Sequence, residues 1–217
     1  MVKILKRIVL ITLILFAIPD FSFSIVEQTN KTVLVKEESQ ETPLERIKEM
    51  IKYMKMYRDE KKEKLNKKEK EENNRIKEKI TSILDVPAMS KEAIGDYWKK
   101  VSVKKRERYS YLLERLVEKI AYPASKEYFN KIDIKYDKVE KLSDDKYIVK
   151  TTVIDKDEDF DVSLDFKLHK TKTGWRVYDV ITDGDSLVLD YKNQFIKIIK
   201  EKGFDHLIKL MERRLKK

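Results

Sequence analysis

The sequence predicts an α+β fold in which N-terminal helices come first, a four-stranded antiparallel sheet follows, and helices return at the C-terminus. Apolar residues recur at helical spacing from Thr42 to about Tyr122, and from Ile132 onward they alternate with polar residues. Strict alternation is typical of an antiparallel sheet with one buried and one solvated face. An amphipathic stripe that begins after Ser186 places further helices after the sheet.

Residues 1–24 are predicted to be a cleavable secretory signal peptide. Lys3, Lys6 and Arg7 precede an apolar run over residues 8–18, and Ser22-Phe23-Ser24 supplies the small residues that a signal peptidase reads. A retained membrane anchor would need about 20 apolar residues, and this run is shorter. We therefore expect an exported protein.

The composition is that of one basic, cysteine-free domain of ordinary size. The 217 residues include 49 Lys and Arg, 39 Asp and Glu and no Cys, for a formal net charge of +10. Without cysteine there is no lipoprotein anchor and no disulfide. A basic surface suits nucleic acid or an anionic membrane. Export argues against nucleic acid, and the sequence holds no zinc-ligand spacing, RNP-like aromatic run or Gly-rich phosphate loop.

Two segments precede the predicted compact domain. Residues 25–41 are polar and aperiodic, and they are predicted to form a disordered leader. Residues 42–79 are predicted to form a charged N-terminal helix that starts with a capping box between Thr42 and Glu45. Its second half is almost entirely charged, so this helix either projects into solvent or breaks near Asn73-Asn74.

The compact domain is predicted over residues 80–217. Val86-Pro87 is expected to end a short helix, Ser90 to cap a second one, and Val101-Ser102-Val103 to form a turn before a third helix from Lys104 to Tyr122. Four alternating segments follow, and their apolar residues begin at Ile132, Tyr147, Phe160 and Trp175.

The polar residues do not indicate a catalytic or metal site. His169 and His206 are the only histidines, and both are expected at the surface. Asp155 to Asp159 carries the alternating carboxylates of a calcium loop. However, Phe160 and Phe166 stand where such a loop requires glycine and glutamate. We interpret this segment as an acidic hairpin tip and predict no metal ligands.

Asp179 is the carboxylate of greatest interest. Strand parity with Trp175 and Val177 places it on the buried face of the sheet. From that position it would orient the turn from Gly184 to Ser186 by accepting hydrogen bonds from backbone N–H groups. This structural role is favoured over work as a general base.

The stretch GWRVYDVITDGDSLVLDYKNQF, Gly174 to Phe195, resembles the signature of the MlaC, or toluene-tolerance, family of periplasmic phospholipid carriers. A second block, LDVPAMSKEAIGDYWKKVSVKKRERY from Leu84 to Tyr109, agrees with the family pattern independently. The resemblance covers about residues 75–217. The positions that match in and after the first block are Trp175, Tyr178, Asp179, Val180, Gly184, Ser186, Leu187, Val188, Tyr191, Phe195, Gly203 and Leu207-Ile208.

The resemblance implies a curved sheet and helices, similar to the NTF2-like fold, around an elongated hydrophobic pocket for acyl chains. Without it, the same apolar stripes would simply fill a core. Asp179, Gly184 and Ser186 would form a structural motif beside the pocket. The residues expected to line the pocket are Trp98, Tyr109, Leu112, Leu113, Leu116, Val149, Thr151, Val153, Val162, Leu164, Phe166, Val177, Leu187, Tyr191 and Phe195.

The function that the resemblance implies is that of a soluble periplasmic shuttle. It would carry phospholipid between an outer-membrane lipoprotein complex and the MCE-domain protein of an inner-membrane ABC transporter, and so maintain outer-membrane lipid asymmetry. Phospholipid would be its cargo, with no cofactor and no enzymatic reaction. Two alternatives remain open: an NTF2-like enzyme, marked by a His–Asp pair in the cavity, and a lipid-free adaptor that binds a partner through the charged 59–79 helix.

Overall fold

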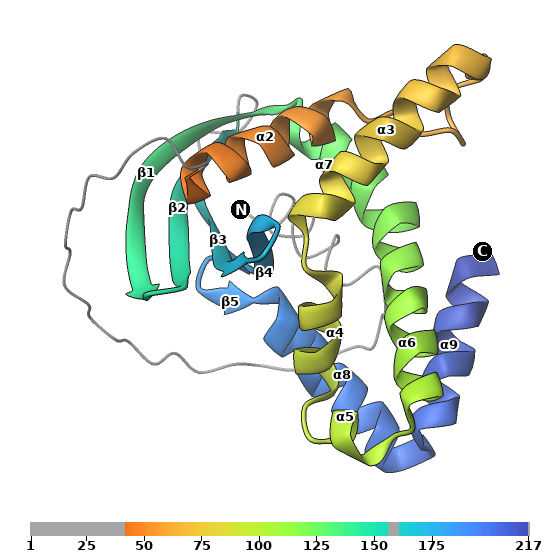
Figure 1. Cartoon of the computed structure of the whole chain (residues 1–217). Coiled ribbons are helices and arrows are strands. Elements are labelled where there is room, and N and C mark those ends of the chain that lie inside the picture. The colour runs from red at the N-terminus through yellow and green to blue at the C-terminus, as the bar shows by residue number, and fades with distance from the viewer. Residues whose placement is uncertain (1–41, 156–160, 217) are drawn as a thin grey trace.

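The computed structural model describes residues 42–155 and 161–216 (Figure 1). The predicted signal peptide, the predicted leader and the tip at 156–160 lie outside the described residues. The α+β prediction is confirmed: helices come first, an antiparallel sheet follows, and helices close the chain. In the described ranges, no helix is both long enough and apolar enough to cross a bilayer.

The N-terminal segment forms two helices, α2 (Pro43–Met56) and α3 (Lys67–Ile83). The capping box predicted at Thr42 is confirmed, because the Glu45 N–H donates to Thr42 Oγ1 at 3.2 Å and the Thr42 N–H donates to the Glu45 carboxylate at 2.8 Å. A second capping box between Asn66 and Glu69 starts α3. Of the two alternatives predicted for residues 42–79, a single projecting helix is therefore wrong and a break is correct.

The break also lies earlier than Asn73-Asn74. Asn73 is buried within α3, where its Oδ1 accepts from the Arg58 N–H at 2.8 Å and its Nδ2 donates to the Arg58 carbonyl at 3.0 Å. These bonds hold the 57–66 connection against α3. Nor does the compact domain start at residue 80, because α2 buries Ile47, Met50 and Met54 in the core.

Helix α3 ends at Ile83, before Val86-Pro87 as predicted, and helix α4 (Val86–Ile94) begins at that pair. Asp85 Oδ1 accepts from the Ala88 N–H at 2.9 Å, and Pro87 sits in the first turn, where a missing N–H costs nothing. Ser90 is fully buried inside α4, so the cap predicted there is wrong.

The helices after α4 follow the predicted order, although their bounds differ. Helix α5 (Tyr97–Lys100) and helix α6 (Val103–Leu116) flank the predicted turn. The chain then passes through a π-helical turn, η1 (Val117–Ala121), into α7 (Tyr122–Phe129). The helical region therefore extends beyond the predicted end at Tyr122, and π-helical turns occur often at functional sites.

The four predicted strands form consecutive antiparallel pairs, and a short fifth strand joins them. They are β1 (Ile132–Ser143), β2 (Lys146–Asp155), β3 (Asp161–Thr171), β4 (Gly174–Thr182) and β5 (Asp185–Ser186). Figure 1 shows β1 and β2 as long curved strands, with α2 crossing beside them. The alternate buried residues of β2, β3 and β4 face the helices.

A two-residue turn at Asp183-Gly184 joins β4 to β5 and leads into α8 (Leu187–Lys202) and α9 (Phe204–Lys216). Both turn residues have positive φ, 50° and 89°. Asp-Gly is a preferred pair for such hairpin turns because glycine meets no steric penalty there. Ser186 then caps α8, as its Oγ accepts from the Leu189 N–H at 3.1 Å.

Replacing Gly184 by valine is expected to lower the free energy of unfolding by about 1–3 kcal/mol. A Cβ added at Gly184 would meet no atom within 4 Å, so the cost comes from backbone strain alone. Any bound lipid should be retained less well, because α8 starts directly after this turn. Urea unfolding measures the effect. Gly184→Asn is the control, since Asn tolerates positive φ better, and equal stability of the valine variant would contradict the argument.

Candidate functional site

An apolar cavity of about 150 Å³ lies where the helices meet the buried face of the sheet. Leu164 and Phe166 from β3 and Val180 from β4 form its sheet wall. Met50 and Met54 from α2 close one side. The cavity thus lies between segments that are more than a hundred residues apart in the sequence.

Helices α4 and α8 supply a second wall. Met89 and Ala93 project from α4, and Leu187, Val188 and Tyr191 from the first turns of α8. These α8 residues follow immediately after the Ser186 cap, so the position of the cap sets where they enter the cavity. The turn that carries the family signature therefore fixes part of this wall.

The π-helical turn η1 forms a third wall together with α6 and α7. Val117, Ile120 and Ala121 line the cavity, with Leu113 and Leu116 from α6 before them. Spacings of three and four residues place these side chains on one helical face. Glu118 and Lys119 lie on a different side of the same turn, where they line a separate cleft.

The cavity has few polar groups. Ser125, Tyr128 and Thr182 line it, and no charged side chain of the described chain does. Tyr128 Oη is buried without a hydrogen-bond partner among the described residues. Burial raises the pKa of Tyr128, and it raises the pKa of the cavity residue Tyr191 as well, so both phenols stay neutral near pH 7. The cavity suits an uncharged, mainly hydrocarbon ligand.

The structure brings together some of the predicted lining residues and leaves others apart. Those that line the cavity are Leu113, Leu116, Leu164, Phe166, Leu187 and Tyr191. Those that lie elsewhere are Trp98, Tyr109, Leu112, Val149, Thr151, Val153, Val162, Val177 and Phe195.

The displaced residues have other neighbours. Tyr109 is fully buried and meets Phe195 and Phe204 edge to face, with ring centroids 6.1 and 5.9 Å apart. Trp98 lies beneath the Arg106 guanidinium at 5.6 Å. Val149 and Val153 belong to the packed core, in which α2 covers β2.

The sequence pattern did not identify Met50, Met54 and Met89 as cavity residues. The first two lie in α2, which was treated as lying outside the lipid-binding domain. Their helical spacing with Ile47 and Ile51 signals a buried face, but nothing in that spacing tells which part of the face borders a cavity.

Asp179 is 6% exposed and orders the start of α8. Its Oδ2 accepts from Ser186 Oγ at 2.8 Å, and its Oδ1 accepts from the Val188 N–H at 3.2 Å. Lys167 Nζ lies 3.5 Å from Oδ2 and balances the charge. The structural role predicted for Asp179 is supported, although the donors are a hydroxyl and the Val188 N–H rather than the backbone of Gly184 to Ser186.

His169 was predicted to lie free at the surface, and this prediction is wrong. Its Nε2 lies 2.7 Å from Asp85 Oδ2, and its side chain is only 23% exposed. Neither residue lines the cavity, and Asp85 serves as the cap of α4. Within the described residues, no cluster of His, Cys, Asp or Glu could hold a metal ion.

A profile described as MlaC protein matches residues 47–213. The chain belongs to the MlaC family. The match begins inside α2, which agrees with the burial of that helix and extends the family region beyond the resemblance over about residues 75–217.

This MlaC-family chain is also similar to one curated protein and one solved structure. The intermembrane phospholipid transport system binding protein MlaC of Haemophilus influenzae is 30% identical over 125 residues, which are 56% of this chain and 58% of that protein. The solved phospholipid-binding protein of Ralstonia solanacearum, in complex with a phospholipid, superposes with a TM-score of 0.58 at 22% identity. That alignment covers 79% of this chain and 93% of the Ralstonia chain, and it shows a shared fold.

Proposed function

We propose that this MlaC-family protein is a phospholipid carrier that encloses acyl chain in the apolar cavity and moves lipid between two membranes. The observation that carries the proposal is the cavity itself, which no charged side chain of the described residues lines. The fold shared with the phospholipid-bound Ralstonia protein and the name of the Haemophilus relative support it.

The energetics of hydrocarbon burial suit a carrier. Each buried methylene contributes about 0.8 kcal/mol, so an acyl chain of about 15 methylenes contributes about 12 kcal/mol before ordering costs. Release into water is then effectively blocked. The lipid leaves when another apolar surface docks at the cavity, and the protein must therefore alternate between docking partners.

The volume of the cavity is too small for a whole phospholipid, and this limits how lipid can enter. A dry cavity of about 150 Å³ holds a molecule about as large as benzene, which is only part of one acyl chain. Met50, Met54 and Met89 line it, and methionine is unbranched and adaptable. Loading therefore requires the cavity to enlarge, and rearrangement of these methionines is the route that the walls offer.

We place this carrier in the periplasm, between an outer-membrane lipoprotein complex and an MCE-domain protein of an inner-membrane ABC transporter, where it helps maintain lipid asymmetry. The predicted signal peptide supports export. The enzyme alternative required a His–Asp pair in the cavity, and the pair at His169 and Asp85 lies outside it. The adaptor alternative predicts a lipid-free protein.

Native mass spectrometry of protein purified without detergent tests the carrier. We expect masses that correspond to one bound phospholipid. A protein that contains no lipid and takes none from liposomes would contradict the proposal and favour the adaptor.

Filling the cavity gives a sharper test. Ala121 lines the cavity, whereas Ala124 on the adjoining helix does not. Ala121→Phe is expected to abolish copurified lipid at a stability cost of about 1–3 kcal/mol, with the fold kept. Ala124→Phe is the matched control and should keep its lipid. Full lipid content in a folded Ala121→Phe protein would show that the ligand lies elsewhere.

A further inference from the structure

A second hollow, a cleft of about 640 Å³, lies between α3, the α6–η1 segment and α9. Figure 1 shows α6 and α9 side by side, with the lower part of α3 beside the top of α6. The cleft shares no lining residue with the apolar cavity. The carrier proposal gives it no role.

The cleft is strongly basic. Its charged side chains are Lys77, Arg108, Arg115, Lys119 and Lys216 against Glu118 and Glu212. Both carboxylates are already engaged, since Arg108 Nη2 lies 2.7 Å from Glu212 and Arg115 Nη2 lies 2.5 Å from Glu118. These pairs hold the two guanidinium groups in place.

Two of the cations are not engaged in this way. The side chains of Lys77 on α3 and Lys216 at the end of α9 make no hydrogen bond or ion pair with any described residue. Lys77 lies near enough to Glu118 to act against the rise that burial causes in the pKa of that carboxyl. Lys119, in contrast, donates to the carbonyl of Leu215. The cleft thus offers two ammonium groups to an incoming anion, one from α3 and one from the end of α9.

The rest of the lining is aromatic and apolar. Tyr111 is 53% exposed, and the guanidinium carbons of Arg108 and Arg115 each lie 5.7 Å from the centroid of its ring. Tyr57, Leu112 and Leu215 complete the surface. A basic rim around an apolar and aromatic floor suits a ligand that carries both carboxylates and a large apolar side chain.

We propose that this cleft is a docking site for an acidic segment of a partner protein. Glutamates or aspartates of the segment would pair with Lys77 and Lys216, and one aromatic or aliphatic side chain would rest on Tyr111 and Leu112. A protein segment is favoured over a membrane surface because the site is concave and formed by three helical elements, whereas a bilayer presents a flat array of headgroups. Charge complementarity at such sites speeds association and fixes register.

Docking in the cleft would also affect lipid transfer, an inference that rests on the proposed function. Glu118 and Lys119 of η1 line the cleft, while Val117, Ile120 and Ala121 of the same turn line the cavity. A segment bound in the cleft therefore contacts the wall that also encloses the lipid. It would hold a membrane complex beside the cavity during transfer.

The probe is a short end-blocked peptide of glutamates with one central phenylalanine, compared with the same peptide built on glutamine. We expect the glutamate peptide to bind, with affinity falling as salt rises. On titration with the peptide, the NMR amide signals of the protein that shift should be those of Lys77, Tyr111 and Lys119 and their neighbours. The double variant Lys77→Glu/Lys216→Glu should weaken binding by about tenfold or more.

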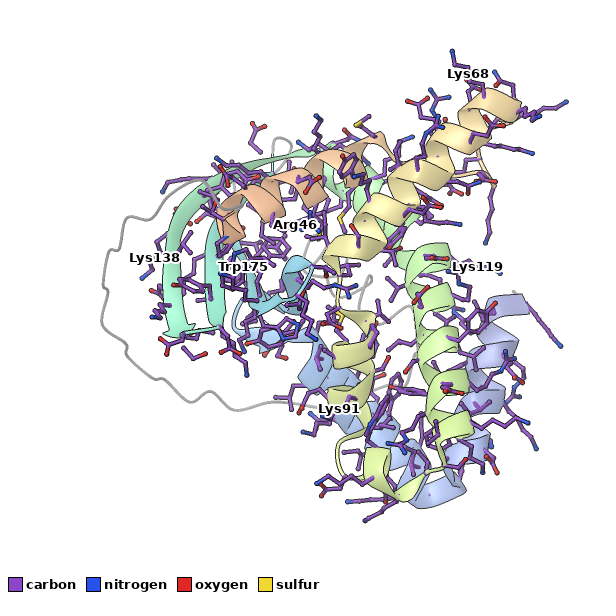
Figure 2. The ribbon with its side chains drawn as sticks, viewed as in Figure 1. Arg46, Lys68, Lys91, Lys119, Lys138 and Trp175 are labelled. Carbon is purple, nitrogen blue, oxygen red and sulfur yellow. The ribbon has the colours of Figure 1, made fainter. Side chains whose placement is uncertain are left out.

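The control is Lys68→Glu/Lys91→Glu, which makes the same charge change at two exposed lysines outside the cleft (Figure 2). It should bind the peptide like the unmodified protein. Equal weakening in both double variants, or equal binding of the glutamine peptide, would overturn the proposal. So would dependence on Lys77 and Lys216 for binding to phosphatidylglycerol vesicles but not to the peptide, which would make the cleft a membrane contact.

Lipid content separates this inference from the carrier proposal. The cleft variant should retain its copurified phospholipid, because neither residue lines the cavity. A wild-type protein without lipid that still binds the acidic peptide would overturn the carrier function and leave the docking site standing.

Discussion

Replacing Leu164 by glutamate is expected to remove copurified lipid. Leu164 is 5% exposed and lines the cavity from β3, so the new carboxylate would be buried without a partner. Burying an unpaired polar group costs about 2–7 kcal/mol, and a charge costs more. Leu116→Glu should act in the same way from the helical wall. Native mass spectrometry reports the lipid, and circular dichroism reports the fold.

The control for this result is Leu142→Glu, at a position on β1 that is 46% exposed. It should change neither lipid content nor unfolding. A Leu164→Glu protein that folds and carries its full complement of phospholipid would contradict the assignment of the cavity. If that variant does not fold, the milder change at Ala121 decides the question.

Substitution of Asp179 by alanine should give the second large effect, a loss of about 2–3 kcal/mol in the free energy of unfolding. The Ser186 hydroxyl and the Val188 N–H would lose their acceptor, and Lys167 would lose a neighbouring charge. The first turn of α8 should then open. Hydrogen exchange at the Val188 amide should rise together with the fall in urea midpoint.

Asp179→Asn separates charge from hydrogen bonding. An asparagine retains one acceptor oxygen and should cost less than alanine. Asp161→Ala, at an exposed position on β3, is expected to leave stability unchanged within about 0.5 kcal/mol. An Asp179→Ala protein with unaltered α8 exchange would show that the Ser186 side chain alone caps the helix.

The sheet was readable from the sequence because its period is simple. In β3 the buried positions Val162, Leu164, Phe166 and Leu168 alternate with partly exposed ones, as the apolar pattern predicted. Strand β5 was missed because two residues carry no period. Its turn is nonetheless signalled by Asp183-Gly184, a preferred hairpin pair.

The helix boundaries were harder to predict, because capping residues are difficult to recognise within a run of charged residues. Asn66 and Glu69 form the same kind of capping box as Thr42 and Glu45, but they stand among lysines and glutamates that all favour helix. Val86-Pro87 follows the end of α3 as predicted, but the pair also starts α4, since proline is favoured in the first turn of a helix. The start of α4 is marked by Asp85, whose side chain caps the helix, and not by Ser90 as predicted.

The cavity could be predicted only in part. Periodicity identifies a buried face, as it did for Leu113, Leu116 and Leu164, but it does not say where that face is covered. Helix α2 fills the space over Val149 and Val153. Arg46 Nε on α2 reaches the Trp175 carbonyl at 3.2 Å. Such contacts depend on the tertiary path of the chain and leave no local pattern.

The same contacts set an order on folding. Arg46 and Trp175 are 129 residues apart, and the linker between α3 and α4 is fixed to β4 by the Asp85 N–H, which donates to the Val177 carbonyl at 2.7 Å. A ribosome delivers α2 and α3 first and β4 near the end. Helix α2 packs mainly on α3 and α7, which precede the sheet, so only the contacts of α2 and α3 with β4 form late. A chain cut short before Trp175 would lack β4 and α8, which close one side of the apolar cavity, and Met50 and Met54 would then face an open hydrophobic surface of the kind that makes incomplete chains prone to aggregate.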